Sequence, residues 1–358
     1  MTGTRLCLEV NDWPEIDRER WRSAQAPAGF LEDDKPASYW TSARRRIVEQ
    51  AYGQWLGFLE RNGELDPAAA PGERATPDCL TAFVNGLRDR VAPVSAAMMV
   101  GALQRMLTAL EPEQDWTALG RVYNHLKQTA APVRDKLSTM VPASELLDLG
   151  IALMETCDRG LTAIYKATRY RDGLIIALLI SCPMRLKNLA ALVVGQHLVS
   201  DGHDYRVRLA ATETKTGRPY VAAVPAELTT YIDRWLQVYR PVPLMAAATR
   251  ATAKIEKHLW VDRNGRPMSS RAIHAQITLR TRQAFGNAIW PHLFRDCAVT
   301  ELVDCAPEEI GIAPDLLGHA ALGTTRKHYI QAQGMTAHRR VQETIAARRR
   351  AARRTPGG

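Results

Sequence analysis

Apolar side chains recur at helical spacing over residues 38–130. A group near the start of this region predicts an amphipathic helix that ends near Asn62-Gly63. The apolar positions of that helix are Ile47, Tyr52, Trp55, Leu56 and Leu59. Similar patterns predict helices that begin at Thr76-Pro77-Asp78, at Ser95 and near Trp116. No stretch of this half alternates as a strand does, so residues 38–130 are predicted to form a helical unit.

The second half begins with helical patterns at Ala143 and Thr162 and then becomes strongly apolar. Arg171 to Val193 predicts a buried helix that Pro183 interrupts, with a second short helix over 189–193. The longest apolar run, 174–180, is too short to cross a bilayer, so no membrane contact is expected.

The clearest strand signal lies at residues 204–224. Tyr205-Arg-Val-Arg-Leu alternates, a polar connection follows, and Tyr220-Val-Ala-Ala-Val is extended again. This pattern predicts a β-hairpin with Lys215 close to its turn. Helices are predicted again at 228–239 and at 270–285, with a short strand at 259–261 between them. The fold class is therefore mainly α with a small β-sheet.

Loss of periodicity sets the predicted boundaries. Residues 1–37 are predicted to be an arm or loosely packed extension, 38–130 a helical domain, 131–142 a linker, 143–335 a second domain and 336–358 a basic tail.

The charge and the cysteine content indicate the kind of binding partner and the cellular compartment. The 358 residues carry a formal net charge of +9, and seven Arg and one Glu in 336–358 supply six of those charges. Clustered Arg and Lys favour a polyanionic partner such as nucleic acid. The six cysteines are scattered without a C-x-x-C pair, and the first twelve residues lack the apolar core of a signal peptide. We therefore expect a cytoplasmic protein.

Basic side chains, histidines and a tyrosine then stand in an order that suggests phosphate chemistry. Transfer of a phosphodiester to a side chain needs fixed cations around the non-bridging oxygens, an in-line nucleophile and a proton donor for the leaving oxygen. Candidates for these roles are Arg185, Lys215, His292, Arg295, His319 and Tyr329. The candidate residues include no paired-carboxylate cluster, and the sequence has no His-x-x-x-His, so no metal or cofactor is implied.

Each candidate taken alone has a commoner structural explanation. A single tyrosine is usually a half-buried aromatic, a lysine near a turn is usually solvated, and a lone histidine is usually a satisfied core residue. The hypothesis rests on the six together, in this order and on these predicted elements.

Together these motifs resemble the tyrosine recombinase or phage integrase family. The resemblance rests on His292-x-x-Arg295, Leu-Gly-His319 and Thr-Thr-Arg-Lys-His-Tyr329, preceded by Arg185 after a broken helix and Lys215 in a hairpin. It covers about 145–335, and the helical unit is similar to the family's SAM-like core-binding domain.

The resemblance implies a site-specific DNA recombinase, with the integration or excision of a mobile element as its role. Tyr329 would attack the scissile phosphate to give a 3′-phosphotyrosyl link, and Arg185 and Arg295 would clamp the phosphate. Lys215 would act as general acid, with His292 and His319 as supporting groups. It further implies a C-shaped clamp on double-stranded DNA, a homo-tetramer on two sites, a DNA-bending or directionality factor, and a nucleoid location in a bacterium.

Three positions depart from the family pattern. Asn188 stands where an acidic residue is common, Asp296 follows Arg295 where His is frequent, and the step from His319 to Tyr329 is one residue longer than usual. Two alternatives therefore stay open: a catalytically impaired DNA-binding accessory protein, and a DNA-relaxing enzyme of the type IB topoisomerase kind.

Overall fold

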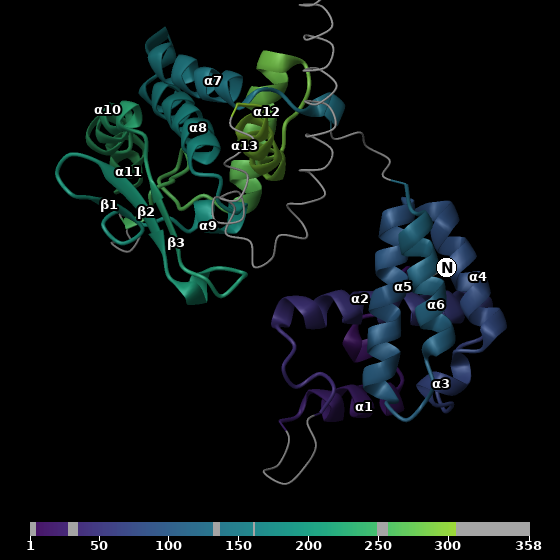
Figure 1. Ribbon diagram of the computed structural model, residues 1–358. Helices are drawn as coiled ribbons and strands as arrows, with labels where there is room; N and C mark the ends of the chain where they lie inside the picture. Colours follow the sequence, from purple (N-terminus) through teal and green to yellow (C-terminus); the bar gives the residue numbers. More distant parts are fainter. Residues whose placement is uncertain (1–4, 28–34, 132–136, 160–161, 249–256, 306–358) are drawn as a thin grey trace, which may run out of the picture. The chain divides into compact units, whose positions relative to one another are not determined.

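The protein is described from a computed structural model that covers residues 5–27, 35–131, 137–159, 162–248 and 257–305 (Figure 1). The chain divides into two compact units, an N-terminal unit, Met1–Asp135, and a C-terminal unit, Lys136–Gly358. Each unit has a hydrophobic core of its own. His319, Tyr329 and the basic tail lie outside the described residues.

All regular structure described in the N-terminal unit is helical. Its helices are α1 (Glu15–Gln25), α2 (Ser42–Asn62), α3 (Pro71–Arg74), α4 (Pro77–Arg90), α5 (Pro93–Leu110) and α6 (Thr117–Thr129), after a 3-10 turn at Val10–Asp12. The predicted end of α2 is confirmed, since Gly63 adopts a left-handed conformation as its C-cap. Thr76 caps α4 through its side chain, as the Thr-Pro-Asp signal predicts.

Aromatic side chains centre the N-terminal core. Trp55 of α2 stacks on Phe58 and meets Phe83 of α4 edge-on at 5.3 Å between ring centroids. Trp55 is fully buried and packs with apolar residues of α5. The amphipathic patterns therefore face a common core, as helices of a small bundle do.

The segment before α2 is packed more closely than its sequence suggests. Trp13 and Trp21 are each only 2% exposed, and the buried Asp17 of α1 accepts hydrogen bonds from Tyr52 and Arg74. These aromatic anchors and the buried ion pair hold α1 in the core, so the expected loosely packed extension is, at least over the described residues 5–27, an integral layer of the N-terminal unit.

In the C-terminal unit a buried helix, α8 (Ala163–Ser181), forms the centre. It packs against α7 (Ala143–Glu155), α12 (Ser270–Phe285) and α13 (Pro291–Cys305) (Figure 1). α7 and α8 approach closely where Gly150 meets Gly173, since a Cβ on Gly173 would lie 2.5 Å from the Gly150 carbonyl oxygen. Further helices are α10 (Thr229–Arg234), a π-helical turn Trp235–Tyr239, and α11 (Pro241–Ala248).

A three-stranded antiparallel sheet completes this unit. Strands β1 (Leu198–Ser200), β2 (Tyr205–Leu209) and β3 (Tyr220–Ala223) pair in the order β1-β2-β3. The predicted hairpin is confirmed as β2 and β3, with Val207 opposite Ala222. The predicted strand at 259–261 is reduced to a single bridge between Val261 and Pro267.

The predicted break in the apolar helix is confirmed, although the next helix differs in register. α8 ends at Ser181, and α9 (Leu186–Ala190) begins directly after Arg185, three residues earlier than the expected helix at 189–193. After Ala190 the backbone pairs with residues 257–259 instead of continuing the helix, since Leu259 donates to the Leu192 carbonyl and Val194 donates to the Lys257 carbonyl. Arg185 is placed at the N-cap of α9.

Candidate active site

Arg185 and Arg295 come together at the break between α8 and α9. Proline has no N–H and disfavours helix in the residue before it, so Pro183 ends α8 and exposes its carbonyl group. Arg295 of α13 donates a hydrogen bond through Nη1 to that carbonyl oxygen. The two arginines line one small hollow together with Asn188 and Tyr220.

Arg295 is held in this place by the start of α13. Thr281, fully buried on α12, accepts a hydrogen bond of 2.9 Å from the Ile289 backbone N–H through its hydroxyl. The contact fixes the chain just before Pro291, the first residue of α13. Arg295 follows one turn later and is only 3% exposed.

Burial makes the electrostatics of this pair unusual. Loss of hydration, and after it the neighbouring positive charge of Arg185, lower the pKa of Arg295 to about 10. Arg295 still carries its charge at neutral pH. Two cations held side by side in a poorly hydrated place form a site that favours an anion.

Lys215 lies in the connection between β2 and β3. It is exposed, and its neighbours Thr214 and Thr216 line the hollow with the two arginines. The turn is closed by Thr214, whose hydroxyl donates to the Arg218 carbonyl over 2.7 Å, and by Gly217, which adopts φ +66°. The hairpin thus brings the turn that contains Lys215 close to the arginine pair, although Lys215 follows Arg185 by 30 residues in the sequence.

His292 lies in the first turn of α13, three residues before Arg295, and is exposed. His292 and Arg295 therefore lie one helical turn apart on α13. His292 does not line the hollow. The places of His319 and Tyr329 are outside the described residues, so the described part of the site consists of Arg185, Lys215, His292 and Arg295.

Tyr220 is a member of this site that sequence reasoning did not select. It is 8% exposed, lines the hollow, and among the described residues its hydroxyl has no hydrogen-bond partner. Burial raises the pKa of Tyr220 well above its ordinary value, so the hydroxyl stays protonated and remains a donor. Its position at the start of a strand after a lysine-bearing turn is a weak signal, because a core role gives the same pattern.

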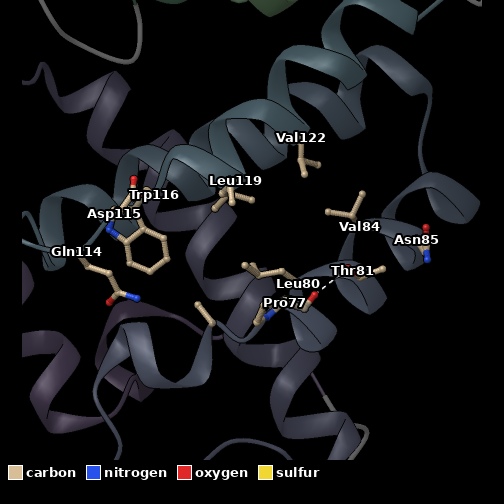
Figure 2. A pocket seen from close by; sticks show the side chains of 12 residues that line it. Pro77, Leu80, Thr81, Val84, Asn85, Gln114, Asp115, Trp116, Leu119 and Val122 are labelled. Atoms are coloured by element: carbon tan, nitrogen blue, oxygen red, sulfur yellow. Dashed lines mark hydrogen bonds between the residues drawn. The ribbon is translucent and has the colours of Figure 1, made fainter.

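A separate apolar groove of about 450 Å³ lies in the N-terminal unit between α4 and α6. Figure 2 shows Leu80 and Val84 of α4 across from Leu119 and Val122 of α6, with Trp116 at one end. None of the four candidate catalytic residues that the structure describes lines it.

Comparison with known proteins shows the family of the chain. The model of the phage integrase family matches residues 151–335, which is just over half of the chain and contains all six candidates. The chain belongs to the phage integrase family. It is similar to the protein called tyrosine recombinase XerC from Pseudomonas fluorescens, with 26% identity over 157 residues. XerC from Pseudomonas syringae pv. tomato matches at the same identity and length.

These matches span 44% of this chain and 47% of each relative, so the chain is aligned with about half the length of the curated relatives. Solved structures extend the likeness of fold. XerH recombinase bound to palindromic difH in a post-cleavage complex has a TM-score of 0.59 at 15% identity, and covers 92% of this chain and 94% of its own. The Tn1549 transposon integrase bound to transposon right-end DNA has a TM-score of 0.50 at 12% identity, and covers 94% and 99%.

The fold of this phage integrase family member is therefore that of tyrosine recombinases, mostly helical with a small sheet, as predicted. In the described part of the chain, no helix is both long and apolar enough to span a bilayer.

Proposed function

We propose that this protein is a site-specific DNA recombinase that cuts and rejoins double-stranded DNA through a 3′-phosphotyrosyl intermediate. The observation that carries the proposal is the pairing of Arg185 with the buried Arg295, with the Lys215-bearing turn beside them. Two basic side chains that line one hollow form an arrangement that suits a phosphate.

In the proposed reaction, the Tyr329 hydroxyl oxygen forms a bond to phosphorus and passes its proton to one of the supporting histidines, His292 or His319, while the bond from phosphorus to the 5′ oxygen breaks. The Lys215 ammonium gives its proton to the departing 5′ oxygen, so that a free 5′-hydroxyl leaves. The forks of Arg185 and Arg295 hold the non-bridging oxygens while negative charge redistributes over them. His292 and His319 add donors to the same phosphate. Reversal of these steps with the 5′-hydroxyl of another strand rejoins the DNA.

The finer parts of the proposal follow from the family resemblance. Both units contact duplex DNA, four protomers assemble on two sites, and a DNA-bending or directionality factor sets the outcome. The reaction serves the integration and excision of a mobile element and takes place in the bacterial cytoplasm, on the nucleoid. Repeats flanking the gene, and a protein–DNA complex with the mass of a tetramer, are the expected observations.

Trapping of a covalent adduct tests the chemistry. The full chain is incubated with lightly nicked DNA fragments from the surroundings of its gene, denatured in detergent, and the protein-linked DNA is sequenced. A nick just beyond the scissile phosphate lets the short 5′-hydroxyl strand diffuse away, so that rejoining fails and the adduct accumulates. We expect adducts at one defined sequence, joined through Tyr329.

Two variants make the test specific. Tyr329→Phe should give no adduct, whereas Tyr165→Phe, which removes an exposed hydroxyl on α8, should behave like the unaltered protein. DNA binding without any adduct would favour the accessory protein. Adducts at many unrelated sequences, with relaxation of any supercoiled plasmid, would favour the topoisomerase-like enzyme.

A further inference from the structure

The Asn188 side chain links α9, which begins after Arg185, to the turn that contains Lys215. It lies on α9, three residues after Arg185, and is 6% exposed. Its Nδ2 donates a hydrogen bond of 3.1 Å to the backbone carbonyl of Glu213, the last residue of the 3-10 turn Ala211–Glu213. Lys215 follows two residues later. A single side chain thus connects the α9 helix to the stem of the lysine-bearing turn.

The direction of this hydrogen bond requires an amide. A carbonyl oxygen only accepts, so its partner must donate, and an ionised aspartate or glutamate has no proton to give. The acidic residue common in the family at this position could not make the contact that Asn188 makes. In this chain, asparagine in place of the acidic residue therefore allows the hydrogen bond to the Glu213 carbonyl.

Glu213 is held from a second side by His197. The Nδ1 atom of His197 accepts a hydrogen bond of 3.0 Å from the Val193 backbone N–H, so the proton of the neutral ring lies on Nε2. Nε2 is 2.8 Å from Oε1 of Glu213 and donates to it. The other carboxylate oxygen, Oε2, accepts from the Ala210 N–H at 2.7 Å.

These bonds fix the stem of the turn at three points. The Glu213 carbonyl is tied to Asn188 on α9, and its carboxylate is tied to His197 before β1 and to Ala210 after β2. Two of the donors, Asn188 and His197, are nearly fully buried, so their positions are set by the core. An exposed lysine on a short, firmly anchored turn has far fewer accessible positions than one on a free loop.

We infer that Asn188 and His197 are positioning residues that act through Glu213 to hold Lys215 beside Arg185, where it meets the leaving oxygen. This inference rests on the proposed function of Lys215 as the general acid. It assigns to Asn188 a role that differs from supporting Arg185.

A substrate that needs no general acid tests this inference. Replacing the 5′-bridging oxygen of the scissile phosphate by sulfur gives a thiolate leaving group, which departs without a proton because a thiol is far more acidic than an alcohol. The full chain and its variants are compared in single-turnover cleavage of the oxygen and sulfur forms of the trapped DNA sequence, with DNA affinity measured in parallel.

Asn188→Asp should slow cleavage of the oxygen substrate by about tenfold or more with DNA affinity nearly unchanged, as expected for a misplaced catalytic group. The sulfur substrate should restore its rate to near that of the unaltered protein, as it should for Lys215→Ala. Arg295→Ala should stay slow on both. The control Asn287→Asp, the same change at an exposed position, should cleave both at the normal rate. Asn188→Asp that is equally slow on both substrates, or normal on both, overturns the inference.

Hydrogen exchange of the free protein gives a second measurement that needs no activity. Loss of one hydrogen bond worth about 1 kcal/mol should speed amide exchange in peptides covering 210–220 by about fivefold in Asn188→Asp and in Glu213→Gln. Exchange elsewhere in the C-terminal unit should be unchanged, which also shows that the variants fold. Unaltered exchange at 210–220 overturns the inference. A protein that exchanges as expected but never cleaves DNA instead contradicts the proposed function alone.

Discussion

Arg295 carries its positive charge where water reaches it poorly. Only 3% of the residue is exposed, and burial together with the like charge of Arg185 lowers its pKa to about 10. Since the folded-state pKa is below the ordinary value for arginine, the charge is complete at neutral pH and is lost as pH rises through about 10. An anionic phosphate relieves both the lost hydration and the repulsion.

Arg295→Ala should therefore affect the transition state more than binding. We expect cleavage to fall by about 10²–10³-fold, roughly 3–4 kcal/mol, while DNA affinity falls less than about tenfold. Single-turnover cleavage and filter binding measure the two quantities. Arg282→Ala, which removes an exposed arginine from the last turn of α12, serves as the control. Equal losses of rate and affinity would count against the clamp role.

Tyr220 and Tyr205 offer a matched pair on neighbouring strands. Both are 8% exposed, but the Tyr205 hydroxyl donates to Asp233 at 2.6 Å, whereas the Tyr220 hydroxyl is unpartnered among the described residues. Removing a buried hydroxyl without a partner recovers its desolvation cost, and removing a bonded one loses the bond. Tyr220→Phe should leave the free energy of unfolding unchanged or raise it by up to about 1 kcal/mol, and Tyr205→Phe should lower it by about 1–2 kcal/mol. Urea unfolding measures both, and a larger loss at Tyr220 would contradict the prediction.

At the scale of elements, the N-terminal segment depends on glycines of α2. A Cβ at Gly53 would collide with the backbone carbonyl of Leu8, whose N–H also donates to the Gly53 carbonyl over 3.0 Å. Backbone cannot move aside as a flexible side chain can, so the close approach requires glycine.

Gly53→Ala should consequently destabilise the N-terminal unit by about 1–3 kcal/mol through displacement of residues 5–8. Gly86→Ala on α4, where an added Cβ meets nothing within 4 Å, should stabilise the same unit by about 0.5–1 kcal/mol because alanine favours helix. Thermal unfolding of both variants decides, and the same sign of change for both would refute the packing argument.

The elements differ in how far the sequence determines them. α12 is found at the predicted residues 270–285 because Ser269 and Gly286 cap it locally. β1 was not predicted, since its three residues become a strand only by pairing with β2, for example Val199 with Arg206. Residues 1–37 were predicted to be loosely packed because the partners of Asp17, namely Tyr52 and Arg74, lie 35 and 57 residues away. Local sequence signals are sufficient to predict helices and turns, whereas short strands and the packing of terminal segments depend on residues far away in the sequence.

The residues of the candidate site also differ in how far the sequence predicts them. Residue types and order were enough to propose Arg185, Lys215 and Arg295. Arg185 and Arg295 line one hollow, and so do Thr214 and Thr216 on either side of Lys215. The sequence could not show that Asn188 donates to Glu213, because a polar residue on a short helix has many possible partners. Tyr220 was overlooked for the same reason.

At the scale of the whole molecule, the two units carry separate cores that share no residue. A buried network stabilises the C-terminal one: Asp172 of α8 accepts from Arg171 and from Arg280 of α12. Separate cores of this size favour separate cooperative unfolding.

Calorimetry should therefore resolve two transitions. Asp172→Asn leaves the buried Arg171 and the partly buried Arg280 without their counter-charge, which costs about 3–5 kcal/mol and should lower the midpoint of one transition by about 10 °C. Gly53→Ala should lower the other transition only. A single transition that both variants shift together would show that the units unfold as one.

Pro183 also determines the direction in which the Arg185 side chain points from the backbone. In an unbroken helix each residue advances about 100° around the axis and 1.5 Å along it, so Arg185 would leave the side that Arg295 faces if α8 continued past Ser181. The break resets that angle and uses the freed carbonyl of Pro183 to hold Arg295. The direction in which the two guanidinium groups point is thus set by main-chain geometry. Insertion or deletion of one residue between 181 and 185 would turn Arg185 away from the phosphate, even though every charged side chain is retained.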